Sequence, residues 1–352
     1  MSPAQTVLHL LDGELSVDMR LIKDQCYLNP EDIVIVGGTL VEGIGNRYSD
    51  IDVYVITREL REGASIDLSR HHRVISVNRE IIRNSADNRR VLLIHTVIPG
   101  SLVKIDVEFK SVDELASLFS RVRQIYEYAC ENLILLTMQL GERERLFIDR
   151  IFKCIAIQNE EAFSDLISEI SRWQACYLEY RWVASDFRYI LDLLGAWNRG
   201  EIDRAVDIAR ENTFLQTAGL LHLTGLIKIG RKWLPHYLEE SAFVNDDLKK
   251  RFRNLFYLRG TETLEGKQCY VEESLDFVDT IFSASQCLLE ANSTFPSGTE
   301  ALNCLSRDRA DLRGNTGQAY AEMEYAYRAK AYGVQGAPTK TLLGRYGAGG
   351  RE

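Results

Sequence analysis

The sequence predicts an α+β protein in which a sheet flanked by helices is followed by an all-helical region. Short apolar runs bounded by turn residues occur up to about residue 110 and are typical of strands. After residue 111, apolar residues recur at helical spacing to about residue 292, with few prolines to interrupt them. We therefore predict a sheet-containing domain over residues 1–111, a helical domain over residues 112–292, and an extended, partly disordered tail over residues 293–352, with a short helix around residues 317–332.

The expected elements of the first domain follow in chain order. Residues 14–28 favour a helix that ends just before a proline, and residues 33–36 form an apolar strand that leads into a Gly-rich turn. Residues 90–98 and 102–109 predict the two strands of a β-hairpin, because the residues between them, Pro99-Gly100-Ser101, are typical of turns.

Two aspartates after the Gly-rich turn are the most informative feature of the chain. Asp50 and Asp52 are one residue apart at the start of a strand-like run, so both side chains point to the same face. Neighbouring carboxylates repel each other unless a cation lies between them, and carboxylate oxygens are ligands that Mg²⁺ prefers. Asp106 and Glu108 share a face of the second hairpin strand. If the two strands are neighbours, the three aspartates converge on a site for two Mg²⁺ or Mn²⁺ ions.

The Gly-rich turn itself predicts phosphate binding. Its glycines, including Gly45, permit positive φ angles and close approach of the backbone to a ligand. Exposed N–H groups in such a turn bind anions, and nearby hydroxyl and guanidinium groups add donors. The residues predicted to contact phosphates are Gly37, Gly38, Thr39, Gly43, Arg47 and Ser49.

Together these motifs resemble the polymerase-beta-type nucleotidyltransferase superfamily, and among its branches most resemble the small aminoglycoside-type nucleotidyltransferases. The resemblance covers roughly residues 30–110 and is carried by Gly38-Thr39, Gly43, Ser49-Asp50-Ile51-Asp52 and Asp106. It implies a nucleotidyltransferase-type mixed sheet in a catalytic domain. One departure is Glu42, since many small members carry arginine before the second glycine.

The resemblance also implies an activity. A nucleoside monophosphate is expected to pass from an NTP, with ATP as the expected nucleotide, to an acceptor on a small molecule, with release of pyrophosphate. Asp50 and Asp52 would coordinate both metal ions, and Asp106 would hold the catalytic one. The helical domain would bind the nucleotide and acceptor. Three other activities stay open: nucleotidylation of a protein side chain, synthesis of short or cyclic oligonucleotides, and non-catalytic nucleotide binding by an interaction protein.

A basic segment in the helical domain is a candidate phosphate contact. Between Lys228 and Arg259 there are eight Lys or Arg against four Asp or Glu, in a chain whose net charge is −9. Lys228 and Lys232 are the residues predicted to reach the nucleotide, and a solvated helix face is the alternative interpretation. The acidic net charge argues against a long nucleic acid as substrate.

Other residue patterns limit location and metal chemistry. Seven cysteines without C-x-x-C spacing predict reduced, mostly buried thiols in a cytoplasmic protein. Neither a signal peptide nor an apolar run long enough to span a membrane is evident. His71 and His72 would point to opposite faces of a strand, which argues against zinc. We interpret His95 as a structural residue of its strand rather than a base.

Overall fold

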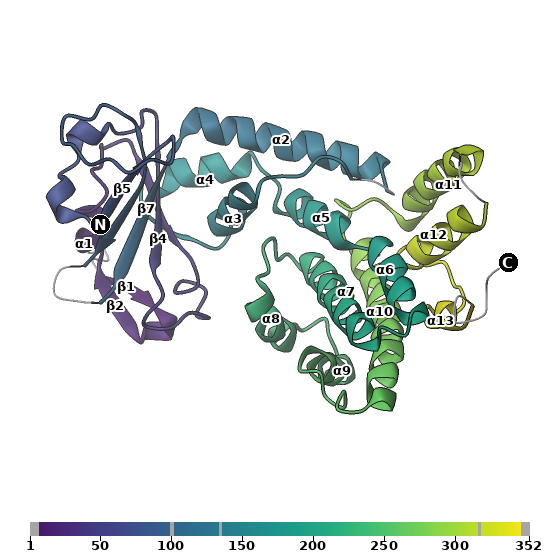
Figure 1. Ribbon diagram of the computed structural model, residues 1–352. Coiled ribbons are helices and arrows are strands. Elements are labelled where there is room, and N and C mark those ends of the chain that lie inside the picture. Colours follow the sequence, from purple (N-terminus) through teal and green to yellow (C-terminus); the bar gives the residue numbers. More distant parts are fainter. Residues whose placement is uncertain (1–6, 99–101, 134–135, 316–317, 346–352) are drawn as a thin grey trace. The chain divides into compact units, whose positions relative to one another are not determined.

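The computed structural model describes residues 7–98, 102–133, 136–315 and 318–345, and it confirms the predicted α+β class (Figure 1). The chain divides into two compact units, each described below by itself. Unit 1 comprises Met1–Arg121 and Glu142–Ser171, and unit 2 comprises Val122–Gly141 and Arg172–Glu352.

Unit 1 contains a small hairpin and a six-stranded mixed sheet. The hairpin joins β1 (Val7–Leu10) to β2 (Leu15–Asp18). The sheet strands, in spatial order, are β5 (Arg73–Ser76), β6 (Val91–Val97), β7 (Lys104–Ser111), β4 (Ile51–Thr57), β3 (Ile33–Gly37) and β8 (Ile155–Gln158). Strands β4 and β7 pair in parallel, and all the other neighbours pair antiparallel. The predicted mixed sheet is therefore present.

Alternation along the strands separates the core from the face that carries the acids. On β4, Ile51, Val53 and Val55 enter an apolar cluster with residues of the β1–β2 hairpin. Tyr54 points to the opposite face, where its ring packs edge-on against Phe147 of α3 at 5.2 Å between centroids. Because side chains alternate along a strand, Asp52 lies on the face of Tyr54 and α3.

Unit 1 contains short helices and the first part of the longer helix α2. They are α1 (Met19–Lys23), α2 (Val112–Glu131, which continues into unit 2), α3 (Glu142–Ile151) and α4 (Glu160–Ser168), with single 3₁₀ turns at Leu11–Gly13, Gly63–Ser65 and Leu68–Arg70. The Ser111 hydroxyl accepts a hydrogen bond from the Glu114 N–H at 3.1 Å, so it caps α2 near the predicted start.

Two sequence predictions in unit 1 are wrong. Residues 14–28 are not one helix, because β2 pairs with β1 and buries Val17 in the core, which leaves only α1 helical. The region beyond residue 112 is not purely helical, because β8 adds to the sheet beside β3. Pairing in the tertiary structure overrides local preference in both cases. The predicted turn at residues 99–101 lies outside the described residues.

Unit 2 is built from helices packed around α7. Its long helices α7 and α10 lie side by side, and α7 also packs against α5 and α6. The helices that lie wholly in this unit are α5 (Arg172–Val183), α6 (Arg188–Asn198), α7 (Ile202–His222), α8 (Leu234–Glu240), α9 (Asp246–Phe256), α10 (Leu264–Ala291), α11 (Gly298–Asn315), α12 (Gln318–Lys330) and α13 (Thr341–Arg345), with a 3₁₀ turn at Arg231–Trp233.

The region predicted as an extended tail instead forms α11, α12 and α13, and α12 confirms the helix expected around residues 317–332. It contains few large aliphatic residues, but its tyrosines and alanines fill the core in their place. Tyr327 of α12 is buried and its ring contacts Phe187 and Phe282 at 5.6 and 5.4 Å between centroids. Lys330 binds Asp279 of α10 at 3.0 Å. The glycine-rich end, residues 346–352, lies outside the described residues.

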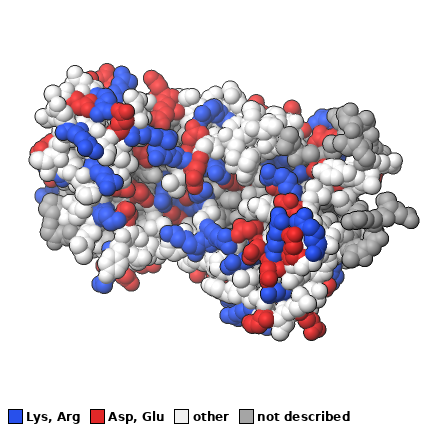
Figure 2. Space-filling model, viewed as in Figure 1, with Lys and Arg blue, Asp and Glu red and all other residues white. Residues whose placement is uncertain are grey.

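Three further properties of the chain can be compared with the sequence predictions: the burial of its cysteines, the apolar character of its helices and the distribution of its surface charges. All seven cysteines are free thiols, but only Cys26 and Cys176 are buried, so the prediction of mostly buried thiols is wrong. No described helix combines the length and the apolar character needed to cross a membrane. Figure 2 shows Lys and Arg interspersed with Asp and Glu on the visible face.

Candidate active site

Four neighbouring strands of unit 1 place a row of functional positions across the sheet. In the strand register, Gly37 of β3 lies opposite Asp52 of β4, Asp52 opposite Asp106 of β7, and Asp106 opposite His95 of β6. Asp50 immediately precedes β4. The parallel pairing of β4 with β7 thus brings Asp52 and Asp106 together, although 53 residues of sequence, from Val53 to Ile105, separate them.

Each aspartate of this row is paired with a basic side chain. All three carboxylates are partly exposed, so the pairs form at a surface that solvent reaches. The pairs are Asp50 Oδ1 with Lys104 Nζ at 2.7 Å, Asp52 Oδ2 with Arg150 Nη2 at 3.1 Å, and Asp106 Oδ1 with His95 Nδ1 at 2.6 Å.

Asp52 has a raised pKa, chiefly because its carboxyl group is buried. Burial raises the pKa of Asp52 to about 6, the Arg150 guanidinium opposes this shift, and the carboxylates of Asp106, Asp50 and Glu108 add to it. The nearby Asp50 carboxylate raises the pKa of Lys104. A cation placed among these carboxylates would relieve the repulsion, so the electrostatics of the row favour a positively charged ligand.

The turn between β3 and β4 brings its backbone against Asp52. Gly38 has φ +100°, and a Cβ atom added there would overlap Asp52 Oδ2, so glycine is required at this position. Gly43 also has a positive φ, +71°. Gly37 and Gly45 do not have a positive φ, but the absence of a side chain lets neighbouring atoms approach their backbone closely. A Cβ on Gly37 would lie 3.3 Å from Arg150 Cδ, and one on Gly45 would lie 2.9 Å from Thr39 Oγ1.

Most amide groups of the turn bond within it. The N–H groups of Val41 and Glu42 donate to the Gly38 carbonyl, and those of Ile44 and Gly45 donate to the Thr39 carbonyl. The predicted anion cradle therefore has fewer backbone donors than the glycine pattern indicates. The Thr39 and Ser49 side chains are partly exposed, and the Ser49 hydroxyl accepts a hydrogen bond from the Asn46 N–H.

The cations predicted to bind phosphates lie in different surroundings. Arg47 is exposed, and its guanidinium lies over the Tyr48 ring, 5.0 Å from the centroid. Lys232 of unit 2 lies over the Trp233 ring, also at 5.0 Å, and Lys228 belongs to unit 2 as well. Contact of Arg47, Lys228 and Lys232 with a nucleotide stays a prediction.

A second set of charges supports the row from α3 and was not predicted. Arg150 binds Glu42 at 3.2 Å as well as Asp52, and Lys153 binds both Glu42 and Asp149 at 3.0 Å. Glu42, the departure from the family pattern, therefore binds both Arg150 of α3 and Lys153, which follows the end of α3 at Ile151. Two basic residues so close together at the end of a helical segment are the signal that could have indicated them.

Two further members of the site carried a sequence signal. Lys104 is two residues before Asp106, so strand alternation puts both on one face. His95 was interpreted as a structural residue, but its pairing with Asp106 makes it part of the site. Recognition of His95 needed the register between β6 and β7, which the hairpin loop length sets.

The aspartates fit Mg²⁺ by donor chemistry, because carboxylate oxygens are its preferred protein ligands and negative charge is in excess around Asp52. Among residues 7–98, 102–133, 136–315 and 318–345, no group of three or more His, Cys, Asp or Glu side chains is arranged to hold a metal ion. In this arrangement Lys104 and Arg150 provide positive charge at the row. A metal role for the three aspartates stays a prediction.

No protein-family model matches the chain, and no curated protein matches it. Among solved structures, it is similar to a nucleotidyltransferase-like protein from Exiguobacterium sibiricum 255-15, with 13% identity and a TM-score of 0.37. The match covers 84% of this chain and 87% of that one.

Proposed function

We propose that the protein transfers a nucleoside monophosphate from an NTP, with ATP as the expected nucleotide, to an acceptor group on a small molecule. The observation that carries this proposal is the register of Asp52 with Asp106 beside the Gly38 turn. Carboxylates on adjacent strands next to a tight glycine turn suit a metal-bound triphosphate. The carboxylates would bind the metal ions, and the glycine turn would leave room for the phosphates.

The three aspartates would hold Mg²⁺, or Mn²⁺ in its place, at two positions. The ions would supply charge neutralisation for the triphosphate and the leaving pyrophosphate. Asp50 and Asp52 would give up their contacts with Lys104 and Arg150 to bind them. The released Lys104 and Arg150 side chains stay close to the site, and both could then face the phosphate oxygens.

Asp106 would receive the proton of the acceptor, and His95 would orient it. In the reaction, the acceptor oxygen forms a bond to the α-phosphorus, and the bond between that phosphorus and the oxygen bridging to the β-phosphate breaks. Pyrophosphate leaves, and the proton of the acceptor hydroxyl passes to Asp106. His95 Nδ1, 2.6 Å from Asp106 Oδ1, orients this carboxylate.

The turn and the basic residues would bind the triphosphate. Gly38 lets the backbone approach, while the hydroxyls of Thr39 and Ser49 are free to turn toward the β- and γ-phosphates. Gly37 and Gly43 shape the turn. Arg47, Lys228 and Lys232 complete the proposed set of phosphate contacts. Positioning and charge neutralisation supply most of the rate enhancement in phosphoryl transfer.

The test is pyrophosphate release by the full chain with each NTP and Mg²⁺ or Mn²⁺, in the presence and absence of a panel of small-molecule acceptors. We expect release with at least one combination of nucleotide and acceptor, and a loss of about 10³-fold or more in Asp50→Asn and Asp106→Asn. Asp203→Asn is the matched control, since Asp203 is exposed in unit 2 and forms a surface ion pair with Lys267. Full activity in either site variant, or no release with any nucleotide, would contradict the proposal.

Product analysis by mass spectrometry identifies the acceptor. A nucleotide joined to a small molecule supports the proposal in full. A nucleotide joined to a protein, or cyclic and 2′–5′-linked products formed without an acceptor, would keep the site chemistry and replace the acceptor class. Nucleotide binding without release of pyrophosphate would support a non-catalytic interaction protein.

A further inference from the structure

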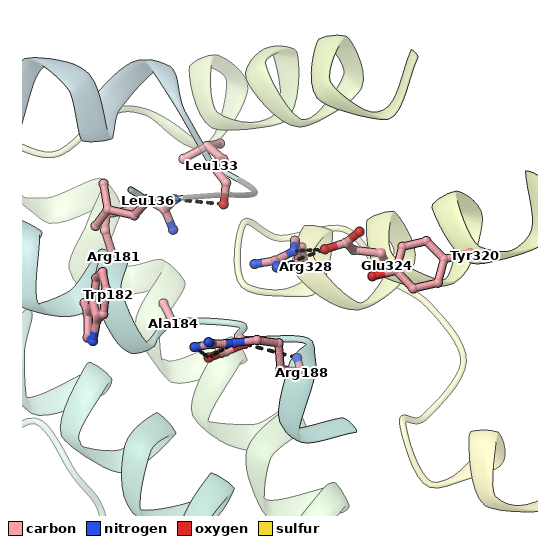
Figure 3. Close-up of a pocket in the computed structure, with 10 residues that line it drawn as sticks. Leu133, Leu136, Arg181, Trp182, Ala184, Arg188, Tyr320, Glu324 and Arg328 are labelled. Carbon is pink, nitrogen blue, oxygen red and sulfur yellow. Dashed lines mark hydrogen bonds and ion pairs between the residues drawn. The ribbon is translucent and has the colours of Figure 1, made fainter. Parts of the chain in front are cut away.

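Unit 2 contains a cavity that the proposed reaction does not use. Its volume is about 350 Å³, within the range of small-molecule sites. Figure 3 shows Arg181, Arg188 and Arg328 reaching into the same space from α5, α6 and α12. Leu133 and Leu136, from the segment after α2, close another side. All the lining residues belong to unit 2.

Arg181 is the unusual member of this cavity. It is 4% exposed, and its Nη2 donates to the carbonyl oxygens of Asn132 and Leu133 at 2.9 and 2.8 Å. Its Nε is buried and has no hydrogen-bond partner among the described residues, and none of their carboxylates forms an ion pair with it. A buried cation without an anion is costly, so a ligand that supplies the anion would be stabilised there.

Other buried donors near Arg181 also lack acceptors. Tyr332, Tyr177 and Tyr180 lie close enough to interact electrostatically with Arg181, and Tyr332 interacts most strongly. Within the part of the chain that the structure describes, their buried hydroxyls have no hydrogen-bond partner. Burial raises the pKa of Tyr177 and Tyr180 well above its ordinary value, so these two hydroxyls keep their protons. This part of unit 2 therefore contains buried polar groups whose hydrogen-bonding capacity is unused.

The other charges that line the cavity are already balanced. Arg328 binds Glu324 at 2.9 Å, and both are buried. Arg188 binds Asp186 at 2.7 Å, and this arginine is exposed. Three arginines against two carboxylates leave a net charge of +1, and that charge belongs to Arg181.

The remaining walls are apolar or aromatic. Trp182 and Tyr320 line the cavity together with the two leucines and Ala184. Aromatic and aliphatic walls favour a ligand with an apolar body, and a guanidinium favours a planar or tetrahedral oxyanion that it can bind through two N–H groups. A small inorganic anion would satisfy Arg181 but leave these walls in contact with water.

We propose that this cavity binds a small organic anion, with a carboxylate or phosphate group at Arg181 and an aromatic or aliphatic body against Trp182 and Tyr320. The site is distinct from the row of aspartates in unit 1, and it does not depend on the proposed nucleotidyl transfer.

Isothermal titration calorimetry on the full chain tests the ligand class with benzoate and phenyl phosphate as probes. Benzyl alcohol is the neutral analogue, and inorganic phosphate is the anion without a body. We expect the two aromatic anions to bind at least 10-fold more tightly than either control. Equal binding of benzyl alcohol would overturn the role of the charge, and binding by neither aromatic anion would overturn the proposal.

Variants test the position of the site. Ala184→Phe fills the cavity without changing a charge and should abolish binding, while Arg181→Lys keeps the charge but loses the planar donor pair and should weaken it about 10-fold. Arg204→Ala is the matched control, because Arg204 is an exposed arginine of α7 paired with Glu201, and its affinity should stay within twofold. If one of these variants fails to fold, Trp182→Ala is the alternative test, because Trp182 is partly exposed. This variant should also weaken binding. Unchanged affinity in the folded variants would place the probes elsewhere and contradict the proposal.

Discussion

The aspartate row of unit 1 and the arginine cavity of unit 2 hold unbalanced charge in opposite ways. At the row, Asp50, Asp52 and Asp106 are partly exposed, each has a basic partner, and negative charge is still in excess around Asp52. In the cavity, Arg181 is buried and its hydrogen bonds end on backbone carbonyls.

The aspartate row and the arginine cavity differ in how easily a ligand can replace the present partner of the charged side chain. The pair of Asp50 with Lys104 is exposed, and such pairs contribute little to stability, so a metal ion can replace this partner at small cost. Arg150, the partner of Asp52, is mostly buried but also binds Glu42, so it keeps a carboxylate partner when Asp52 is taken by a metal ion. Arg181 has no carboxylate to exchange among the residues that the structure describes, so a ligand anion adds a partner rather than replacing one. Four predictions test this comparison, from the largest expected effect to the smallest.

The largest effect is expected for the buried ion pair of the cavity. Arg328→Met leaves the buried Glu324 carboxylate without its partner and should lower the free energy of unfolding by about 3–5 kcal/mol. Arg188→Ala removes an exposed pair and should cost less than about 1 kcal/mol. Denaturant unfolding of the two variants measures both values. If both variants lost less than about 1 kcal/mol of unfolding free energy, the buried pair of the cavity would be as solvated as an exposed ion pair.

Gly38→Ala should damage the row by a contact that a matched glycine lacks. Gly13 has nearly the same φ, +95° against +100°, but a Cβ there meets no atom within 4 Å. Gly13→Ala should therefore cost only the backbone strain, about 1–2 kcal/mol. Gly38→Ala adds the overlap with Asp52, roughly 1–3 kcal/mol more, and should also reduce pyrophosphate release. Thermal unfolding and the release assay measure the two effects, and identical behaviour of both variants would exclude the contact with Asp52.

Asp52→Asn should stabilise the protein at neutral pH while it removes activity. Because the pKa of Asp52 is raised from 3.8 to about 6, the folded state holds this proton more tightly than the unfolded state does. Stability is therefore lost as pH rises from about 4 to about 6, by on the order of 2–3 kcal/mol. The asparagine variant lacks this loss.

Melting temperature against pH measures this effect. The variant should melt above the parent protein at pH 7.5, and the two should converge below pH 4. Asp203→Asn, at an exposed position in unit 2, controls for the loss of one negative charge. A variant that is less stable than the parent at pH 7.5 would mean that the Arg150 pair outweighs the repulsion within the row.

The smallest effect is expected at Lys104. If this lysine competes with a metal ion for Asp50, Lys104→Gln should tighten Mg²⁺ binding about threefold to fivefold, which corresponds to an exposed ion pair of up to about 1 kcal/mol. Calorimetric titration with Mg²⁺ measures the affinity. Lys340→Gln, which removes an exposed pair with Asp276 in unit 2, should leave it unchanged. Weaker binding in Lys104→Gln would argue against competition at Asp50.

The sequence predicted strands followed by a helical region because both depend on residue periodicity, and the resemblance implied that the strands form a mixed sheet. The sequence also predicted that Asp50 and Asp52 share a face, since strand alternation follows from backbone geometry alone. Four-residue β8 escaped prediction because so short a run carries little periodic signal. Of the helices after residue 293, α12 was expected, while α11 and α13 escaped because each buries few large aliphatic residues.

The site shows the same division between local and long-range information. The amino-acid sequence by itself determined which residue types stand at the glycine turn and on which face of each strand the acids lie. Long-range packing set the rest: Asp52 lies beside Asp106, His95 and Arg150 complete the row, and Arg181 is buried with no carboxylate partner among the described residues. The physical reason is that the face of a side chain is a property of its own strand or helix. Its neighbours and its burial depend on segments that meet only when the chain has folded.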